Sequence, residues 1–292
     1  MATPGETCVL IPTLNEATTI GSVVDGFREA GFARVLVVDG RSDDDTVTVA
    51  REHGAEVILQ TGVGKGRAVR EGLDAVEAPY VLLVDGDGTY LPADAPRMVA
   101  PLDSTAEHVV GDRFADLQPG AMTRLNQVGN RLINRVFATI HGEDFGDILS
   151  GYRAFTRDST ERMHLVADGF GIETELAVEC VRHGVPVEVV GVTYRERPDD
   201  SETNLRPVRD GAVILSTLYR LAKTTNPLVY FGLLGLVSGL VSVVVGGFVV
   251  YEWFANHVPH LVLAMVAAFG LLFGVQLLTF GVLSEMIIRL YP

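Results

Sequence analysis

The sequence predicts an α/β domain with a mostly parallel sheet, followed by a hairpin of two transmembrane helices. Short β-branched runs alternate with helical patterns over residues 1–205, and such alternation is typical of strand–helix–strand units. Two long runs without charged residues follow near the C-terminus. Of the net charge of −14, residues 227–292 carry only −1, so an acidic soluble part is joined to an apolar part.

Six runs rich in β-branched residues predict strands, at Thr7–Ile11, Arg34–Asp39, Ala55–Leu59, Tyr80–Asp85, His108–Val110 and Val185–Val192. Between the first four of these, helical patterns predict helices at Glu16–Ala30, Asp45–His53 and Gly64–Glu77. Strands joined in this way are parallel, and ligands bind at their carboxyl ends. We therefore expect the functional residues directly after each strand.

Two uncharged runs predict the transmembrane hairpin. Residues 227–251 form a helix of about 37 Å at 1.5 Å per residue, which is long enough to span a bilayer. A second helix is predicted over residues 261–288, with residues 252–260 as a turn outside the membrane. A buried soluble pair is the weaker interpretation, because nothing else in the chain could cover two helices that are apolar on every side.

Basic residues flank the two spans but are absent from the turn between them: Arg206, Arg209, Arg220, Lys223 and Arg289. The positive-inside rule then places residues 1–205 and the C-terminus in the cytoplasm. The first apolar stretch, residues 8–12, is too short for a signal peptide. Residues 206–226 carry apolar and basic residues at helical spacing, which predicts an amphipathic helix at the inner leaflet.

Composition excludes several classes of protein and of partner. A hydrophobic content of 48% with only two cysteines excludes a disordered chain and a disulfide scaffold. Lys65 and Lys223 are the only lysines among 23 basic residues, against 37 acidic ones, which favours a high-salt cytoplasm. The negative charge also argues against a nucleic-acid partner.

Cysteine and histidine offer no metal site in this sequence. Cys8 and Cys180 lie in apolar and helical runs, so we expect two buried free thiols and a reducing compartment. The seven histidines lack metal-ligand spacing, and zinc is not expected.

Asp85 and Asp87 are the sharpest feature of the soluble part. They follow an apolar strand and are separated by Gly86, so both carboxylates can point into one crevice. Oxygen ligands of this kind suit Mg²⁺ or Mn²⁺ bridging a diphosphate. Asp39, at the matching end of the second strand, makes an ordinary turn the weaker interpretation.

Two further segments predict contacts with a nucleotide. Asp39 can accept hydrogen bonds from a base or a ribose. The glycine-rich segment 62–67 offers backbone N–H groups and the cations Lys65 and Arg67 at a helix N-terminus, although it lacks the spacing of a P-loop.

In this order along the chain, the strings PTLNE, VVDG, GKGRAVREG and DGD resemble the family 2 inverting glycosyltransferases of the GT-A fold. Downstream, the strings GDRF and DILSGYRAF, Arg124, and the pair Glu173 and Glu175 are similar to the acceptor half of polyprenyl-phosphate sugar synthases, the dolichol-phosphate-mannose synthase group. With its acidic, lysine-poor composition, the chain is most similar to dolichol-phosphate hexosyltransferases that begin N-glycan assembly for surface-layer glycoproteins in salt-loving archaea.

The resemblance implies a nucleotide-sugar donor, a divalent cation and a dolichyl or polyprenyl phosphate acceptor. It implies nucleotide contacts at Pro12, Asn15, Glu16, Asp39, Lys65 and Asp85, and a metal and diphosphate held by Asp85 and Asp87. It assigns the lipid phosphate and a closing loop to four arginines, Arg113, Arg124, Arg153 and Arg197, whose guanidinium groups can grip phosphate oxygens.

The implied reaction is an inverting, metal-dependent sugar transfer. A phosphate acceptor is already ionised, so catalysis rests on positioning and on stabilising the departing diphosphate. Two departures from the family leave details open. Asn204 stands where relatives carry a lysine, which leaves the closing-loop cation open, and the string VVDGRSDDDT leaves the base open among UDP-glucose, UDP-N-acetylglucosamine and GDP-mannose. The resemblance favours a UDP-hexose.

Four alternatives remain beside this interpretation. A GDP-mannose-dependent dolichol-phosphate-mannose synthase and an undecaprenyl-phosphate glucosyltransferase differ only in donor or lipid. A processive polysaccharide synthase would need more membrane helices and a QxxRW string, which this sequence lacks. A catalytically silent membrane scaffold or transporter subunit is disfavoured, since Asp85 and Asp87 are both present and the spans carry no charge for a polar pathway.

Overall fold

The computed structural model describes the whole chain except residues 1, 105, 170, 199–218, 220–225 and 291–292. It divides into an N-terminal unit, Met1–Leu218, and a C-terminal unit, Tyr219–Pro292. Asn204 and nearly all of the amphipathic helix predicted for residues 206–226 lie outside the described residues.

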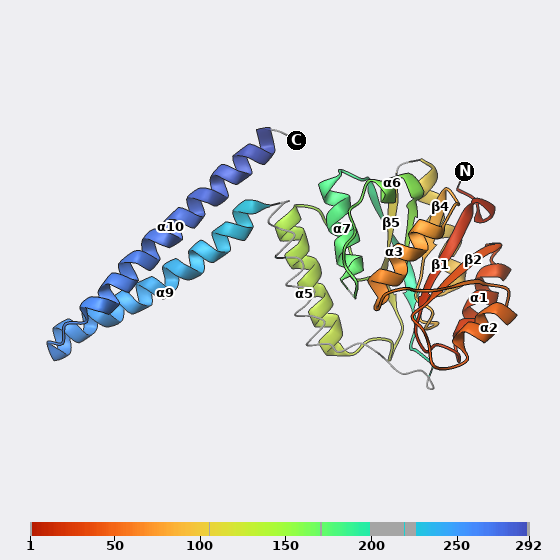
Figure 1. The fold of residues 1–292 in the computed structure, drawn as a ribbon, viewed down its shortest axis with the longest axis horizontal. Helices are drawn as coiled ribbons and strands as arrows, with labels where there is room; N and C mark the ends of the chain where they lie inside the picture. Colours follow the sequence, from red (N-terminus) through yellow and green to blue (C-terminus); the bar gives the residue numbers. More distant parts are fainter. Residues whose placement is uncertain (1, 105, 170, 199–218, 220–225, 291–292) are drawn as a thin grey trace. The chain divides into compact units, whose positions relative to one another are not determined.

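The N-terminal unit is built on a mixed sheet of seven strands in the order β3-β2-β1-β4-β6-β5-β7 (Figure 1). All neighbouring strands are parallel except that β6 runs antiparallel to β4 and β5. The strands are β1 Thr7–Thr13, β2 Arg34–Asp39, β3 Glu56–Leu59, β4 Tyr80–Leu83, β5 His108–Leu117, β6 Arg153–Thr156 and β7 Val187–Tyr194. The predicted α/β class with a mostly parallel sheet is confirmed.

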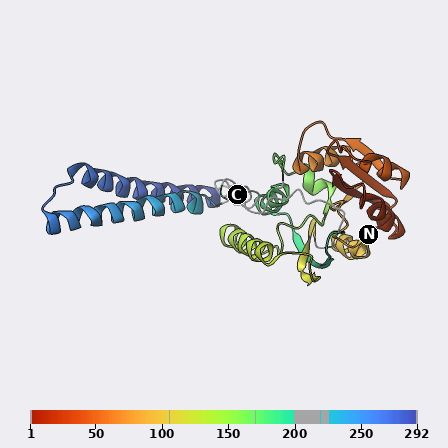
Figure 2. The same ribbon diagram turned by 90° about the horizontal axis from the view of Figure 1, so that it is seen from below.

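Helices cover both faces of the sheet, as Figures 1 and 2 show from two directions. Val9 and Ile11 of β1 pack against α1, α2 and α4, whereas Leu10 points to the other face, toward α3 and α7. The helices are α1 Ile20–Glu29, α2 Thr46–Glu52, α3 Lys65–Ala75, α4 Ala95–Val99, α5 Arg124–His141, α6 Arg157–Glu161 and α7 Ile172–Arg182, with short 3₁₀ turns at Pro4–Glu6, Pro92–Asp94 and Ala100–Asp103.

Strand β6 is the element that the sequence pattern misses. It has only four residues, and it begins with a fully buried arginine, Arg153, so it shows neither an apolar run nor a clear alternation. Other differences lie at element ends. β1 reaches Thr13 and β5 reaches Leu117, whereas β4 already ends at Leu83, before the two aspartates.

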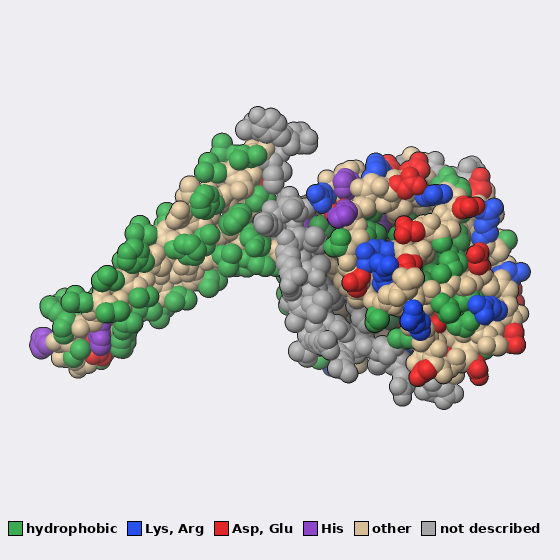
Figure 3. Space-filling view, viewed as in Figure 1, with side chains coloured by type: hydrophobic (Ala, Val, Ile, Leu, Met, Phe, Trp, Pro, Cys, Tyr) green, Lys and Arg blue, Asp and Glu red, His purple; other side chains and the backbone are tan. Residues whose placement is uncertain are grey.

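The C-terminal unit is a pair of apolar helices, α9 Pro227–Asn256 and α10 Leu261–Leu290, each long and apolar enough to cross a membrane. α9 is longer than predicted and leaves only residues 257–260 as the connection. The helices cross closely at Gly235 and Gly274, where an added Cβ on either would come within 2.7 Å of the other's carbonyl oxygen. Figure 3 shows the contrast in surface: hydrophobic side chains cover the pair, and charged side chains are spread over the N-terminal unit.

Candidate functional site

Asp85 and Asp87 lie in the loop directly after β4. Oδ1 of Asp87 accepts hydrogen bonds from the backbone N–H and the hydroxyl of Thr89, at 3.0 and 2.6 Å. Oδ2 of Asp87 accepts one from Arg197, at 2.8 Å. Asp85 Oδ1 lies 2.5 Å from Nζ of Lys65. Gly151 lies against the other oxygen of Asp85, since an added Cβ there would be only 2.4 Å from Oδ2.

Lys65 joins Asp85 to the first turn of α7. Its Nζ lies 2.5 Å from Oε1 of Glu173 as well as from Asp85, and the ammonium is buried between the two carboxylates. Burial alone would lower the pKa of Lys65, but the two carboxylates outweigh it and hold the pKa above its usual value. Lys65 is therefore a permanent cation beside Asp85, while its predicted contact with a nucleotide stays a prediction.

Arg197, in the segment after β7, joins Asp87 to Glu16. The same nitrogen that donates to Asp87 also donates to Oε1 of Glu16, at 3.1 Å. Burial raises the pKa of Glu16 to about 7; Arg197 lowers it, and the negative charges of Asp87 and Asp85 raise it further. The raised pKa therefore reflects first the burial of the carboxyl, with the neighbouring aspartates as a further contribution.

The acid cluster, defined as Glu16, Asp85, Asp87 and Glu173 with the cations Lys65 and Arg197, fits a divalent cation. Its carboxylates outnumber its cations by two, which is the charge of one Mg²⁺ or Mn²⁺ ion, and all its free ligands are oxygen atoms. Within the described residues, no three acidic, histidine or cysteine side chains are placed to hold a metal by themselves. An ion here would complete its shell with phosphate oxygens and water, as Mg²⁺ commonly does.

The loops after β1 and β2 are tied together at the end of the sheet that should receive a nucleoside. Asn15 has a left-handed φ of 58°, donates its N–H to Ser42 Oγ at 2.8 Å, and accepts the N–H of Asp43 at 3.0 Å. Asp39 is fully buried and accepts hydrogen bonds from Ser42 N–H and Oγ, and from Thr13. In this loop conformation Asp39 orders the loop, and its contact with a base or a ribose stays a prediction.

Two other predicted nucleotide-binding segments are partly covered in the structure. Pro12 lies within β1, one residue before its end, and is buried opposite Val38. At the N-terminus of α3, the N–H of Arg67 donates to the carbonyl oxygen of Asp168, at 3.2 Å, because the segment 165–168 covers the glycine-rich loop. That N–H is already used, which leaves the side chain of Lys65 as the part of this motif that faces the acid cluster.

The arginines expected at a lipid phosphate fall into two groups. Arg153 is fully buried and donates to the carbonyl oxygens of Ser150 and Ile148, at 3.0 and 2.6 Å, and lies 3.2 Å from Nε2 of His108. Its predicted contact with phosphate is wrong, because its hydrogen bonds hold the 148–150 loop. Arg113 is also buried, and both oxygens of Asp147 bind it, so a phosphate could reach it only by breaking that pair.

Arg124 and Arg197 are the two accessible members of the set. Arg124 is exposed at the first position of α5, whose N-cap Thr123 accepts the N–H of Asn126. At 100° per residue, the exposed side chains of Leu125, Val128 and Leu132 form one apolar stripe along α5. The same spacing places Arg124, Arg131 and Arg135 in a row directly beside this apolar stripe.

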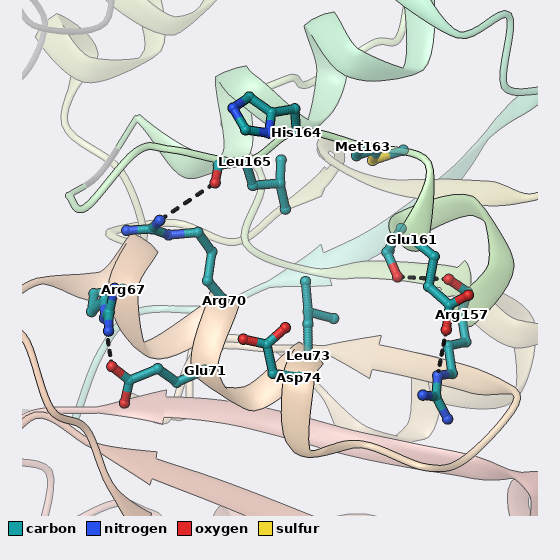
Figure 4. A pocket seen from close by; sticks show the side chains of 11 residues that line it. Arg67, Arg70, Glu71, Leu73, Asp74, Arg157, Glu161, Met163, His164 and Leu165 are labelled. Carbon is teal, nitrogen blue, oxygen red and sulfur yellow. Dashed lines mark hydrogen bonds and ion pairs between the residues drawn. The ribbon is translucent and has the colours of Figure 1, made fainter.

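A separate groove of about 390 Å³ lies between α3 and the segment 157–165 (Figure 4). Of the residues that the sequence points to, Arg67 of the glycine-rich segment lines it, but no member of the acid cluster does. Arg67 pairs with Glu71 and Arg157 with Glu161 within the groove, and Arg70 pairs with Asp168, so the groove is distinct from the acid cluster.

The sequence pattern assigns no individual role to two residues that organise this site. Glu173 belongs to the pair shared with the acceptor half of polyprenyl-phosphate sugar synthases, and Asp147 begins the string DILSGYRAF. Their partners lie far away along the chain, Lys65 for Glu173 and Arg113 for Asp147. The available signal was an acidic residue at the start of an otherwise apolar, buried helix in the case of Glu173.

Residues 8–163, which include the aspartate pair, match a known family model described as glycosyl transferase family 2. The chain belongs to glycosyl transferase family 2. This confirms the resemblance that the strings from PTLNE to DGD predict.

Cys8 and Cys180 are buried free thiols, as expected.

Curated relatives show which members of glycosyl transferase family 2 this chain is similar to. It is 56% identical to glycosyltransferase AglJ of Haloferax volcanii over 292 residues, which is 100% of this chain and 96% of AglJ. It is 35% identical to a dolichyl-phosphate hexose transferase of the same organism, over 70% of this chain and 89% of the relative. It is also 30% identical to a polyprenol monophosphomannose synthase of Mycolicibacterium smegmatis, over 65% and 78%.

Solved structures confirm the GT-A fold. Glucosyl-3-phosphoglycerate synthase from Mycobacterium tuberculosis, in complex with Mn²⁺, uridine diphosphate and glucosyl-3-phosphoglycerate, superimposes with a TM-score of 0.62. The two chains are 24% identical, and the match covers 74% of this chain and 80% of that one. The fold is therefore shared, including the mixed sheet that carries the acid cluster.

Proposed function

We propose that this glycosyltransferase moves a hexose from a nucleotide-diphosphate sugar to dolichyl or polyprenyl phosphate at the cytoplasmic face of the membrane. The product would be a lipid-phosphate sugar used in N-glycosylation of surface proteins. The observation that carries the donor half of the proposal is the acid cluster at the carboxyl end of β4, with two carboxylates in excess of its cations. The kinship with AglJ and with a dolichyl-phosphate hexose transferase supports the acceptor.

Asp85 and Asp87 would hold Mg²⁺ or Mn²⁺, as the Mn²⁺ and uridine diphosphate in the neighbouring structure suggest. The metal would supply charge stabilisation for the departing diphosphate. Lys65 adds a fixed positive charge beside Asp85, and Arg197 adds one beside Asp87. These groups favour the charge that develops on the diphosphate as the anomeric carbon is attacked.

The acceptor is already an anion, so the chain has to position it rather than deprotonate it. Attack from the face opposite the diphosphate inverts the anomeric configuration. On α5, the row of arginines beside the apolar stripe suits a lipid phosphate, because the guanidinium groups meet phosphate where the stripe meets hydrocarbon. Arg124, at the start of the row, is our candidate for the lipid phosphate, and Arg197 for the closing segment.

The membrane part of the proposal rests on α9 and α10. Each is apolar along its length, and the described side chains offer no charged path between them that would suit a transporter. With basic residues only at the outer flanks of the pair, we place residues 1–205 and the C-terminus in the cytoplasm.

GDP-mannose is the alternative donor, favoured by the kinship with a polyprenol monophosphomannose synthase. The acid cluster binds the diphosphate that both donors share, so it does not discriminate between them. A silent scaffold is the alternative from another class, but it would have no need for the buried excess of negative charge around Asp85.

The test is sugar transfer to dolichyl phosphate by the detergent-solubilised full chain in high salt. A panel of radiolabelled UDP- and GDP-sugars is supplied with Mg²⁺, with Mn²⁺ or with EDTA. Transfer from one UDP-hexose, dependent on metal, is the expected result. Transfer from GDP-mannose alone would select the alternative donor, and no transfer by folded protein from any donor would favour the scaffold.

A further inference from the structure

We propose that Glu173 is a positioning residue for Lys65. When Asp85 binds the divalent cation, Glu173 remains as the counter-ion of Lys65, and the metal can bind without leaving Lys65 unpaired. The inference rests on the proposed function, which places that cation at Asp85 and Asp87. It concerns a carboxylate that lies on α7, on the far side of Lys65 from the aspartates.

Lys65 contacts two carboxylates, which is one more than a neutral ion pair requires. Nζ of Lys65 lies 2.5 Å from Asp85 and 2.5 Å from Glu173, and Glu173 is only 4% exposed. One ammonium and one carboxylate would already form a neutral pair. The second carboxylate leaves one negative charge more than Lys65 supplies, with Glu173 buried and Asp85 partly exposed. The buried guanidinium of Arg153 attracts Glu173 but makes no direct ion pair with it, so a further cation would stabilise the group.

The carboxylate of Glu173 becomes important when a metal binds. Once a divalent cation binds Asp85, the attraction between Asp85 and Lys65 is largely lost. Lys65 then keeps a partner in Glu173 without moving, and the pair stays neutral. Without Glu173, Lys65 would either remain on Asp85 and compete with the metal, or become a buried cation with no counter-ion.

The local structure fixes Glu173 and Lys65 relative to each other. Glu173 stands in the first turn of α7, where the helix dipole favours a carboxylate. Two residues further along α7, Glu175 accepts the N–H groups of Val166 and Ala167 at about 3 Å, which orders the segment that covers the glycine-rich loop. That segment also binds the N–H of Arg67, close to Lys65 in α3. Both ends of the pair are therefore anchored by one segment.

The experiment measures metal-dependent binding rather than turnover. Mg²⁺ or Mn²⁺ is titrated into the detergent-solubilised full chain with fluorescent UDP or GDP at a fixed concentration. The variants are Glu173→Gln, Lys65→Met and the double variant, with Glu179→Gln as the matched control because Glu179 is buried on the same helix but does not contact Lys65.

We expect Glu173→Gln to raise the metal concentration for half-maximal nucleotide binding about tenfold, and Glu179→Gln to leave it unchanged. In the Lys65→Met background, adding Glu173→Gln should change it by less than about twofold, because Glu173 acts through Lys65. Glu173→Asp, which keeps the carboxylate, should lie closer to wild type than Glu173→Gln, and it serves as the second variant if the glutamine variant does not fold.

An equal loss from Glu173→Gln in both backgrounds would overturn the inference, since Glu173 would then act only as one more negative charge near the metal. That result would leave the proposed function intact. Wild-type protein that binds neither nucleotide in a metal-dependent way would overturn the proposed function, and this inference with it.

Discussion

The two halves of the sheet treat buried charge in opposite ways. In the donor half, β1 to β4, the carboxylates of Glu16, Asp85 and Asp87 outnumber Lys65, and the whole acid cluster, which also takes Glu173 from α7 and Arg197 from the segment after β7, has two carboxylates in excess. In the acceptor half, β5 to β7, Arg113 is paired with Asp147, and Arg153 donates to carbonyl oxygens and lies beside His108. Buried charges whose partners are groups of the fold itself hold the structure, and carboxylates left in excess mark the place where a ligand brings the missing charge.

The largest effect should come from the unbalanced half. Asp87→Asn removes a proposed metal ligand and the carboxylate that pairs with Arg197, so sugar transfer should fall about a thousandfold. Asp116→Asn in β5 is the control, because that carboxylate is exposed and only accepts a hydrogen bond from Thr193. Initial rates with the donor identified by the panel test this, and undiminished transfer by Asp87→Asn would place the metal elsewhere.

Arg153 should show the opposite behaviour, with an effect on stability rather than on ligand binding. Arg153→Met leaves two carbonyl oxygens and a buried histidine without their donor, and it should lower the free energy of unfolding by about 4 kcal/mol. Arg157→Met, an exposed arginine paired only with Glu161 and a carbonyl oxygen, should cost less than about 1 kcal/mol.

Chemical unfolding in high salt measures both arginine variants. The KM for the lipid acceptor, measured on the folded fraction, should be unchanged in Arg153→Met. A raised KM with unchanged stability would mean that Arg153 binds the acceptor. The two halves of the sheet would then not differ in the way proposed.

The same contrast explains what the sequence could predict. In the donor half, each apolar strand is followed at once by polar residues, so strand ends and the positions of Glu16, Asp85 and Asp87 can be read from local pattern. In the acceptor half, the role of an arginine depends on a partner distant in sequence: Asp147 is 34 positions from Arg113, and His108 is 45 from Arg153. Residue type alone does not separate a phosphate ligand from a structural ion pair.

The missed strand β6 has the same cause. Its register with β4 and β5 is set by tertiary pairing, and Arg153 in its first position hides the apolar pattern. Asp39 illustrates the converse case. The sequence correctly places it at the end of β2. Its hydrogen bonds to Ser42, three residues away, depend on the conformation of the loop, which residue types alone do not predict.

The buried carboxyl of Glu16 should also make the stability of the donor half depend on pH. The folded pKa of Glu16 is about 7, above the ordinary value of 4.5, so the folded state holds this proton more tightly than the unfolded state. The stabilisation is complete below pH 4.5 and is lost as the pH rises toward 7. The full difference corresponds to about 3 kcal/mol.

Glu16→Gln isolates this contribution, since it keeps the size of the side chain but does not ionise. In EDTA and high salt, the Tm of wild type relative to Glu16→Gln should fall as the pH rises from 4.5 to 8. Saturating Mg²⁺ with UDP or GDP should reduce the fall, because a cation then compensates the ionised carboxylate. A Tm difference that is independent of pH would mean that Arg197 already neutralises Glu16, and the donor half would no longer be unbalanced.

The smallest effect should come from α5, where charge and apolar surface face outward rather than into the core. Replacing Leu125, Val128 and Leu132 by glutamine removes the apolar stripe without touching the buried side of the helix, at Ile133 and Phe137. In liposomes containing dolichyl phosphate, the KM for the acceptor should rise about tenfold, because less apolar surface is available to meet the bilayer.

The KM for the nucleotide sugar should not change in this variant, since the acid cluster is intact. Leu59→Gln with Val166→Gln provides the control, as both are similarly exposed apolar side chains outside α5. Equal effects of the α5 substitutions and the control substitutions would mean that the apolar stripe has no specific role in acceptor binding. An effect confined to the α5 set, which disappears with a short-chain acceptor in detergent, would show that the acceptor half works at its surface while the donor half works through its buried charge.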